Sequence, residues 1–167
     1  FDEGGITKIK KINITGNTSF DKNTILSIIK SRTKNITNIF ANNNFKIFQL
    51  NNDRIRIQNF YKEQGYRDVQ IDYDVEYFPN NKVEINFLVN EGNPYFINDL
   101  KIKNNLDNNI DVQNEILELI ETNQNNIINI YNSTKLDEIE FDISKILENN
   151  GIQYFNITAF EKFNNYK

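Results

Sequence analysis

Residues 82–105, KVEINFLVNEGNPYFINDLKIKNN, decide the fold because their second half repeats the beginning of the chain. The pair Glu91-Gly92 is followed by an alternating apolar run. The same pair and the same kind of run occur at Glu3-Gly4, at one constant offset in the sequence. The matched positions are Ile9, Ile12, Ile14 and Asn17 in the first copy and Ile97, Leu100, Ile102 and Asn105 in the second. A constant offset across a corner, a strand and a turn indicates a tandem repeat of one small module.

The repeat divides the 167 residues into three parts. We interpret residues 1–5 as the end of a preceding module, 6–91 as a first module and 92–167 as a second, truncated module. Each module lies in the size range where a small domain folds around a modest core. The hydrophobic content of 38% and the aromatic content of 13% favour packed modules over a disordered chain.

The composition excludes several classes of function. A net charge of −4 gives no electrostatic reason to expect nucleic acid as a partner, because such binding needs clustered lysine and arginine. The absence of cysteine from the sequence removes disulfides and thiolate sites. The sequence also has no run of about 18 apolar residues, so no transmembrane helix is predicted.

The first module is predicted to begin with a strand over residues 8–15 that ends in the turn Gly16-Asn17. Asp21 is the predicted N-cap of a helix that ends near Ser31, with Phe20 placed to pack against its first turns. Residues 32–49 are too apolar for a free linker and predict a packed loop with a short helical turn.

A second helix and a hairpin are predicted to follow. Asn51-Asn52-Asp53 is expected to cap a helix whose core stripe includes Ile55 and Ile57 and which ends at Gly65. Residues 69–77 alternate strictly between apolar and polar and predict a half-buried strand. The turn Pro79-Asn80-Asn81 and a further alternating run over 83–89 complete a β-α-α-β-β order.

That order predicts an α+β module with a three-stranded mixed sheet covered by two helices on one face. A tight hairpin must be antiparallel, whereas the first and last strands can run parallel, which places the last strand in the middle. The strand over 69–77 then keeps one edge unpaired, and an exposed edge is either blunted or used for binding. The candidate peptide-binding residues are Val69, Gln70, Ile71, Asp72, Tyr73, Asp74, Val75, Glu76 and Tyr77.

The second module repeats the order but lacks its last strand. We expect a strand over 95–103, helices capped by Asp111 and by Ser133 or Thr134, a stop at Gly151 and a hairpin arm over 155–163. Because the strand that would pair with both others is missing, we expect the natural protein to continue. In this fragment we expect the second module to be loosened, rearranged or completed by a neighbouring chain, through self-association of strand edges.

The sequence offers no catalytic constellation, since it has no histidine, no cysteine and no glycine-rich phosphate cradle. Asp72, Asp74 and Glu76 share one strand face and could bind a hard cation, but such a face is usually solvated. The basic group of Lys8, Lys10 and Lys11 is likewise interpreted as a solvated face. We therefore expect neither an enzyme nor a cofactor or metal.

Three short motifs of the first module form a recognisable set: Gly16 and Asn17 in the turn, Gly65 and Tyr66 after the second helix, and Glu91 and Gly92 at the exit. As a set they resemble the polypeptide-transport-associated (POTRA) domains of BamA-type outer-membrane assembly proteins. The likeness covers essentially the whole chain, more strongly in the first module, which looks most like the third domain of such an array, with the second module as the fourth. In the second module, Gly151-Ile152 stands where the pattern has Gly-Tyr.

The resemblance implies a periplasmic region ahead of a membrane β-barrel that lies outside this fragment. It implies two kinds of partner, unfolded outer-membrane proteins added as strands at a sheet edge and accessory lipoproteins of the assembly complex. Two alternatives stay open: a related transporter that secretes one dedicated polypeptide, and a purely structural spacer array.

Overall fold

The computed structural model describes residues 6–34, 42–97, 100–106, 109–127 and 130–159. The chain splits into two compact units, Phe1–Pro94 and Tyr95–Lys167, and each is described by itself. The expected end of a preceding module, residues 1–5, lies outside the described residues. So do residues 35–41 of the predicted loop and 160–163 of the predicted hairpin arm.

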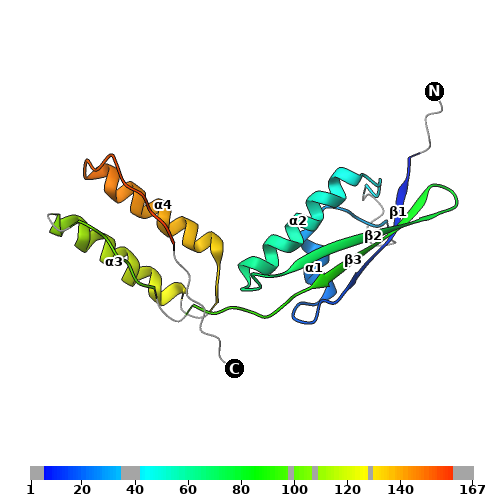
Figure 1. Cartoon of the computed structure of the whole chain (residues 1–167). Helices are drawn as coiled ribbons and strands as arrows, with labels where there is room; N and C mark the ends of the chain where they lie inside the picture. The colour runs from blue at the N-terminus through cyan, green and yellow to red at the C-terminus, as the bar shows by residue number, and fades with distance from the viewer. Residues whose placement is uncertain (1–5, 35–41, 98–99, 107–108, 128–129, 160–167) are drawn as a thin grey trace. The chain divides into compact units, whose positions relative to one another are not determined.

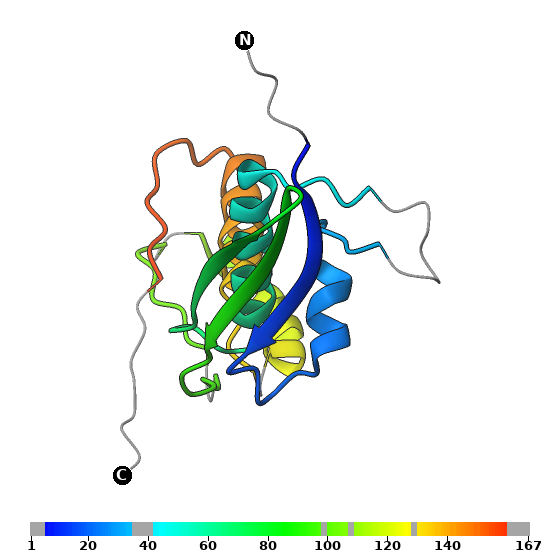
Figure 2. The ribbon, with the colours of Figure 1, turned by 90° about the vertical axis from the view of Figure 1, so that its right-hand side faces the viewer.

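The first unit has the predicted β-α-α-β-β order (Figure 1). Its elements are β1 (Lys8–Thr15), α1 (Lys22–Ile28), α2 (Ile47–Glu63), β2 (Gln70–Phe78) and β3 (Lys82–Asn90). The three strands form one mixed sheet in the order β1-β3-β2 (Figure 2). β1 runs parallel to β3 and β2 runs antiparallel to it, so the prediction of a central last strand is confirmed.

A β-bulge explains the irregular alternation of β1. The register with β3 shifts between Ile9 and Lys11, so Lys10 is an extra residue and both Ile9 and Ile12 face the core. The hairpin turn between β2 and β3 places Asn80 and Asn81 at positive φ, 62° and 51°, a region that asparagine tolerates better than most residues.

Both helices cover the same face of this sheet. One continuous hydrophobic cluster joins Ile25 and Ile29 at α1 and Leu50, Ile57 and Tyr61 of α2 to the inward side chains of all three strands. Each of these five residues is completely buried. The predicted fold class is therefore confirmed for the first unit.

Helix α1 begins as its sequence predicts. The Asp21 carboxylate accepts hydrogen bonds from the backbone N–H groups of Asn23 and Thr24, at 2.7 and 3.0 Å. These bonds satisfy two amides that have no partner inside the helix. The helix ends at Ile28, a little before the predicted stop at Ser31.

The predicted start of α2 was wrong. The helix begins at Ile47, and Asp53 lies inside it, fully buried. The Asp53 carboxylate reaches the chain beyond α1, where it accepts from the backbone N–H groups of Lys30 and Ser31 at 2.7 and 2.8 Å. Asp53 therefore resembles a cap in sequence but binds amides of another segment.

The core stripe of α2 is also narrower than predicted. Ile57 and Tyr61 are buried, whereas Ile55 is 44% exposed. Gly65 follows the helix with φ of 92°, which confirms the predicted glycine stop.

The second unit contains a helix pair, α3 (Ile110–Ile127) and α4 (Ser133–Asn149). Apolar residues at helical spacing bury one stripe of each helix against the other. The buried members are Val112, Ile116 and Ile120 of α3 and Ile139, Ile143 and Leu147 of α4. Within the described ranges, no helix of the chain has the length and apolar character needed to cross a membrane.

The predicted strands of the second unit are not formed in its described residues. Residues 95–97 and 100–103, and residues 155–159, carry no strand, although Leu100, Ile102 and Ile157 pack against the helix pair. An alternating pattern gives a strand only where a neighbouring strand accepts its hydrogen bonds. The described part of this unit supplies no such neighbour.

The caps of the second unit also differ from prediction. α4 is capped by Asn132, whose side chain accepts from the N–H of Lys135 at 3.2 Å, rather than by Ser133 or Thr134. Asp111 lies inside the first turn of α3 and does not precede it. Gly151, with φ of 77°, follows α4 as predicted.

Candidate functional site

Strand β2 forms one edge of the sheet in the first unit, as the strand order requires (Figure 2). It pairs with β3 along its whole length, from Gln70 opposite Asn90 to Phe78 opposite Lys82. Its other side faces no strand among the described residues. The predicted open edge is therefore present in the fold.

The backbone groups that point out of this edge follow from two hydrogen bonds of β1. The N–H of Lys8 donates toward β3, to the Asn81 carbonyl at 2.8 Å, and the N–H of Ile9 donates away from β3, to the Asn43 carbonyl at 2.7 Å. Residues of β1 whose side chains face the core, as Ile9 does, thus direct their backbone outward.

β2 runs antiparallel to β1 on the other side of β3, so its core-facing residues direct their backbone outward as well. Ile71, Tyr73 and Val75 therefore present N–H and C=O groups at the open edge. The backbone N–H and C=O groups of Asp72, Asp74 and Glu76 point toward β3 and bond to it. This alternation gives a row of hydrogen-bonding groups that an added strand can use.

The two edges of the sheet are not equally open. Residues 43–45 cover the first half of β1: Ile9 donates to Asn43, and the N–H of Phe45 donates to the Thr7 carbonyl at 2.8 Å. The Asn43 side chain adds a bond to the Ile9 carbonyl at 3.1 Å. No comparable backbone bond from another described segment reaches the outer side of 70–78. β2 is thus the longer free edge.

Side chains give this edge an acidic outer face. Asp72, Asp74 and Glu76 are exposed on the face away from the helices, and Tyr77 at the end of the row is 70% exposed. On the inner face, the Tyr73 hydroxyl donates to Asn51 of α2 at 2.9 Å. Within the residues that the structure describes, no three carboxylates gather into a group that could hold a metal ion.

Val69 needs a correction as a candidate residue. The strand begins at Gln70, and Val69 is buried with its N–H bonded to the Tyr66 carbonyl at 3.3 Å. It belongs to the turn that leads from α2 into β2. The candidate edge is therefore residues 70–78 and not 69–77.

Glu91 holds the end of this sheet to the rest of the unit. It is only 7% exposed, and its carboxylate accepts from the backbone N–H groups of Thr18 and Ser19, both at 2.9 Å. The hydroxyls of Thr18, Ser19 and Tyr61 also donate to it. The sequence singled out Glu91 as a motif residue, but this role depends on partners far away in the chain.

Burial raises the pKa of Glu91, but the hydrogen bonds from Thr18, Ser19 and Tyr61 together outweigh it and hold this pKa below its ordinary value. Burial, followed by the hydrogen bond to Glu91, raises the pKa of Tyr61. Glu91 is therefore a carboxylate and Tyr61 a neutral donor at neutral pH.

The other motif residues lie in the turns that follow β1, α2 and β3. Gly16 has φ of 81°, and a Cβ there would lie 2.0 Å from the Val89 carbonyl oxygen. Asn17 donates its side-chain amide to the Phe20 carbonyl at 2.9 Å, and the Tyr66 hydroxyl donates to Ser19 at 2.7 Å. Gly65 and Gly92 both adopt positive φ. The motif residues thus have a structural role: they fix the ends of the strands.

The fold defines a class of protein: a β-α-α-β-β module with an acidic open edge on an antiparallel hairpin. A family model agrees with this class. The POTRA family, described as "Surface antigen variable number repeat", matches residues 7–92. The chain belongs to the POTRA family, which confirms the resemblance noted in its motifs.

Individual relatives agree. The chain is 31% identical over 153 residues to the outer membrane protein assembly factor BamA of Buchnera aphidicola subsp. Acyrthosiphon pisum, an alignment that covers 90% of this chain and 24% of that protein. The chain thus spans about a quarter of the length of this curated relative. The crystal structure of POTRA3-5 of Haemophilus influenzae BamA has the same fold, with a TM-score of 0.62 at 21% identity, over 86% of this chain and 55% of that one.

Proposed function

We propose that this region is a non-enzymatic, periplasmic binding module of a machine that assembles outer-membrane β-barrels, and that β2 receives unfolded barrel precursors as added strands. The observation that carries the proposal is the outward row of backbone groups at Ile71, Tyr73 and Val75 on an edge that no described segment covers. Backbone bonds give affinity with little sequence preference, as a receptor for many unfolded chains needs.

The relatives support the same proposal. The Buchnera relative is named as an outer membrane protein assembly factor, and the alignment with it covers most of this chain. On this proposal residues 6–91 are a third and residues 92–167 a fourth module of such an array, and the structure of POTRA3-5 in another BamA has the same fold. On this proposal the module also docks accessory lipoproteins, and a membrane barrel lies outside the fragment.

The proposal makes a residue-specific prediction for hydrogen exchange. A labelled, unfolded peptide from a barrel strand should slow exchange at the amides of Ile71, Tyr73 and Val75. The amides of Asp72 and Asp74 already bond to β3 and should change little. Slowing spread equally over both sets would contradict strand addition at this edge.

A proline substitution tests the same row. Val75→Pro removes one outward N–H, and proline is tolerated on edge strands. We expect the affinity for the peptide to fall about tenfold, because one backbone hydrogen bond and the strand geometry around it are lost. Val75→Ala is the matched control, since it removes similar packing but keeps the N–H.

The remaining readings predict different results. A structural spacer array would leave both the exchange rates and the affinities unchanged at any peptide concentration tested. A transporter for one dedicated polypeptide would bind that polypeptide and reject strands from unrelated barrels. Comparable affinity for several unrelated barrel strands supports the assembly function.

A further inference from the structure

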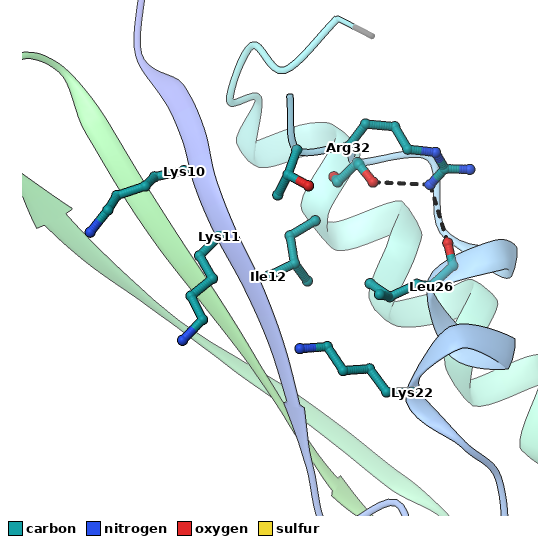
Figure 3. Close-up of a pocket in the computed structure, with 8 residues that line it drawn as sticks. Lys10, Lys11, Ile12, Lys22, Leu26 and Arg32 are labelled. Carbon is teal, nitrogen blue, oxygen red and sulfur yellow. Dashed lines mark hydrogen bonds between the residues drawn. The ribbon is translucent and has the colours of Figure 1, made fainter. Parts of the chain in front are cut away.

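The second edge of the sheet has a different chemistry. A groove of about 330 Å³ runs along β1 and is bounded on the other side by α1 and the residues after it (Figure 3). Its lining includes four basic residues, Lys10, Lys11, Lys22 and Arg32, on a chain whose net charge is −4. This basic surface is local and cannot be recognised from the net charge of the chain.

We propose that this groove is a second binding site, for an extended segment of a partner protein in which acidic and apolar residues alternate, and that the segment adds to the free half of β1. This site goes beyond the function proposed for β2, because it lies on the opposite edge and selects its partner by charge. Three features carry the inference: free backbone groups, apolar residues in the lining and the positive charge of the lysines.

The backbone groups are available in the second half of β1. Residues 43–45 bond to Thr7 and Ile9 only. Ile12 and Ile14 face the core as Ile9 does, so their N–H and C=O groups also point away from β3. No other described segment donates to or accepts from them. A short strand can therefore pair with β1 at these two residues.

Two apolar residues, Ile12 and Leu26, lie in the lining of the groove beside the polar Ser31 and Thr33. Figure 3 shows Ile12 and Leu26 pointing toward one another across the groove, one from β1 and one from α1. Side chains on one side of an added strand would lie over these two residues, and every second residue of the strand would face them. We therefore expect apolar residues on the side of the added strand that faces Ile12 and Leu26.

The basic residues of the groove differ in the hydrogen bonds and ion pairs that they form within the chain. Lys10 donates to Glu84 at 2.7 Å and lies 4.6 Å from the centre of the Phe78 ring. Arg32 donates to the backbone carbonyls of Leu26, Ile29 and Ser31. Lys11 forms no hydrogen bond with another described residue, but it lies opposite Glu84 in the register with β3, and, after the hydrogen bond from Lys10, its charge helps to lower the pKa of that carboxyl. In contrast, Lys22 forms no hydrogen bond or ion pair with another described residue. Figure 3 shows the Lys22 amino group extended toward β1 and Lys11 extended along the sheet.

These positions define the partner. Lys11 lies where the outward side of an added strand would pass, and Lys22 lies at the rim of the groove. Opposite charges on neighbouring strands stabilise pairing, and like charges oppose it. The β2 edge, with Asp72, Asp74 and Glu76, has the reverse preference. One sheet therefore separates partners by charge, acidic segments to β1 and neutral or basic segments to β2.

The test uses the whole chain and two peptides of about eight residues, the length of a short strand. One alternates valine with glutamate and the other alternates valine with lysine. We expect the glutamate peptide to bind at β1, to slow exchange of the Ile12 and Ile14 amides, and to weaken as salt is raised. Binding of both peptides at β1 with equal affinity would overturn the proposal.

Charge-neutralising variants complete the test. Lys22→Gln and Lys11→Gln should each lower the affinity for the glutamate peptide about twofold to fivefold, the range of exposed ion pairs. Lys8→Gln is the matched control, because Lys8 is an exposed lysine of the same strand outside the groove. Equal losses in all three variants would show unspecific attraction and overturn the site.

Three further outcomes would also overturn it. Displacement of the peptide by inorganic phosphate at similar concentration would show a site for small anions only. Concentration-dependent dimers that disappear in Lys22→Gln would show that a second copy fills the groove. Loss of glutamate-peptide binding in Val75→Pro, but not in Val75→Ala, would place the peptide on β2. A β1 site that survives Val75→Pro stands even if reception at β2 fails.

Discussion

The hydroxyl of Tyr61 in α2 donates a hydrogen bond of 2.9 Å to the carboxylate of Glu91, just beyond the end of β3. Through the same carboxylate the helix is joined to Thr18 and Ser19, beyond the end of β1. The Glu91 side chain thus fixes three parts of the unit relative to one another: the turn between β1 and α1, helix α2, and the central strand β3. Its loss should affect the whole first unit.

The first prediction concerns Glu91→Gln. The amide keeps one acceptor oxygen but turns a donor toward the N–H groups and hydroxyls that now meet a carboxylate. We expect the free energy of unfolding at pH 7 to fall by about 3 kcal/mol, because charge-assisted bonds are lost in a buried site. Chemical denaturation followed by circular dichroism measures it.

The pH dependence of this difference has a defined sign. The pKa of Glu91 in the folded state lies below its ordinary value of 4.5. Its stabilising contribution is therefore complete above about pH 4.5 and is lost as the pH falls from there through the folded pKa. The stability gap between the natural chain and Glu91→Gln should shrink only in that acid range. Glu84→Gln is the control, and it should cost much less stability because its Lys10 partner is half exposed.

The second prediction compares two glycines with similar backbone angles. Gly16 and Gly151 have φ of 81° and 77°, but a Cβ at Gly16 would meet the Val89 carbonyl oxygen at 2.0 Å, whereas a Cβ at Gly151 would meet no atom within 4 Å. Gly16→Ala should destabilise the first unit by more than about 3 kcal/mol, since the β1 turn must move away from β3. Gly151→Ala should cost only about 1 to 2 kcal/mol, the price of the left-handed angle. Equal effects would show that the angle alone matters.

Local signals explain what could be predicted from the sequence. The Asp21 cap and the stops at Gly65 and Gly151 depend on neighbours within a few residues, and all three are present in the structure. The order β1-β3-β2 followed from connection lengths and chain direction. The edge strand was therefore identified with an error of one residue at each end.

Non-local contacts explain what could not be predicted. Asp53 has the sequence of a helix cap, but its partners Lys30 and Ser31 lie more than twenty residues earlier. Residues 95–103 alternate as β1 does, yet alternation cannot supply the partner strand that β1 finds in β3. The direction of the free backbone groups could be determined only from the hydrogen bonds that the N–H groups of Lys8 and Ile9 form in the structure.

The third prediction concerns Asp53→Ala. The substitution leaves the amides of Lys30 and Ser31 without their acceptor and removes the ion pair with Arg56 at 2.8 Å. We expect a loss of about 3 to 5 kcal/mol, the usual cost of breaking a buried charged network by removing one partner. Asp21→Ala removes the exposed cap at the beginning of α1 and should cost much less stability than Asp53→Ala. If the two variants lose the same stability, the buried network contributes no more than an ordinary cap.

The fourth prediction separates the two units by hydrogen exchange in a dilute monomer. The amides of β3, bonded to strands on both sides, should open only with the unfolding of the first unit. The amides of residues 100–103 belong to no strand and should exchange almost as fast as those of an unfolded chain, although Leu100 and Ile102 pack on the helices. Amides in the middle of α3 and α4 serve as the internal control, because measurable protection there shows that the second unit is folded. Protection at 100–103 equal to that of β3 would mean that these residues form a paired strand in solution, which would contradict their strand-free conformation in the structure.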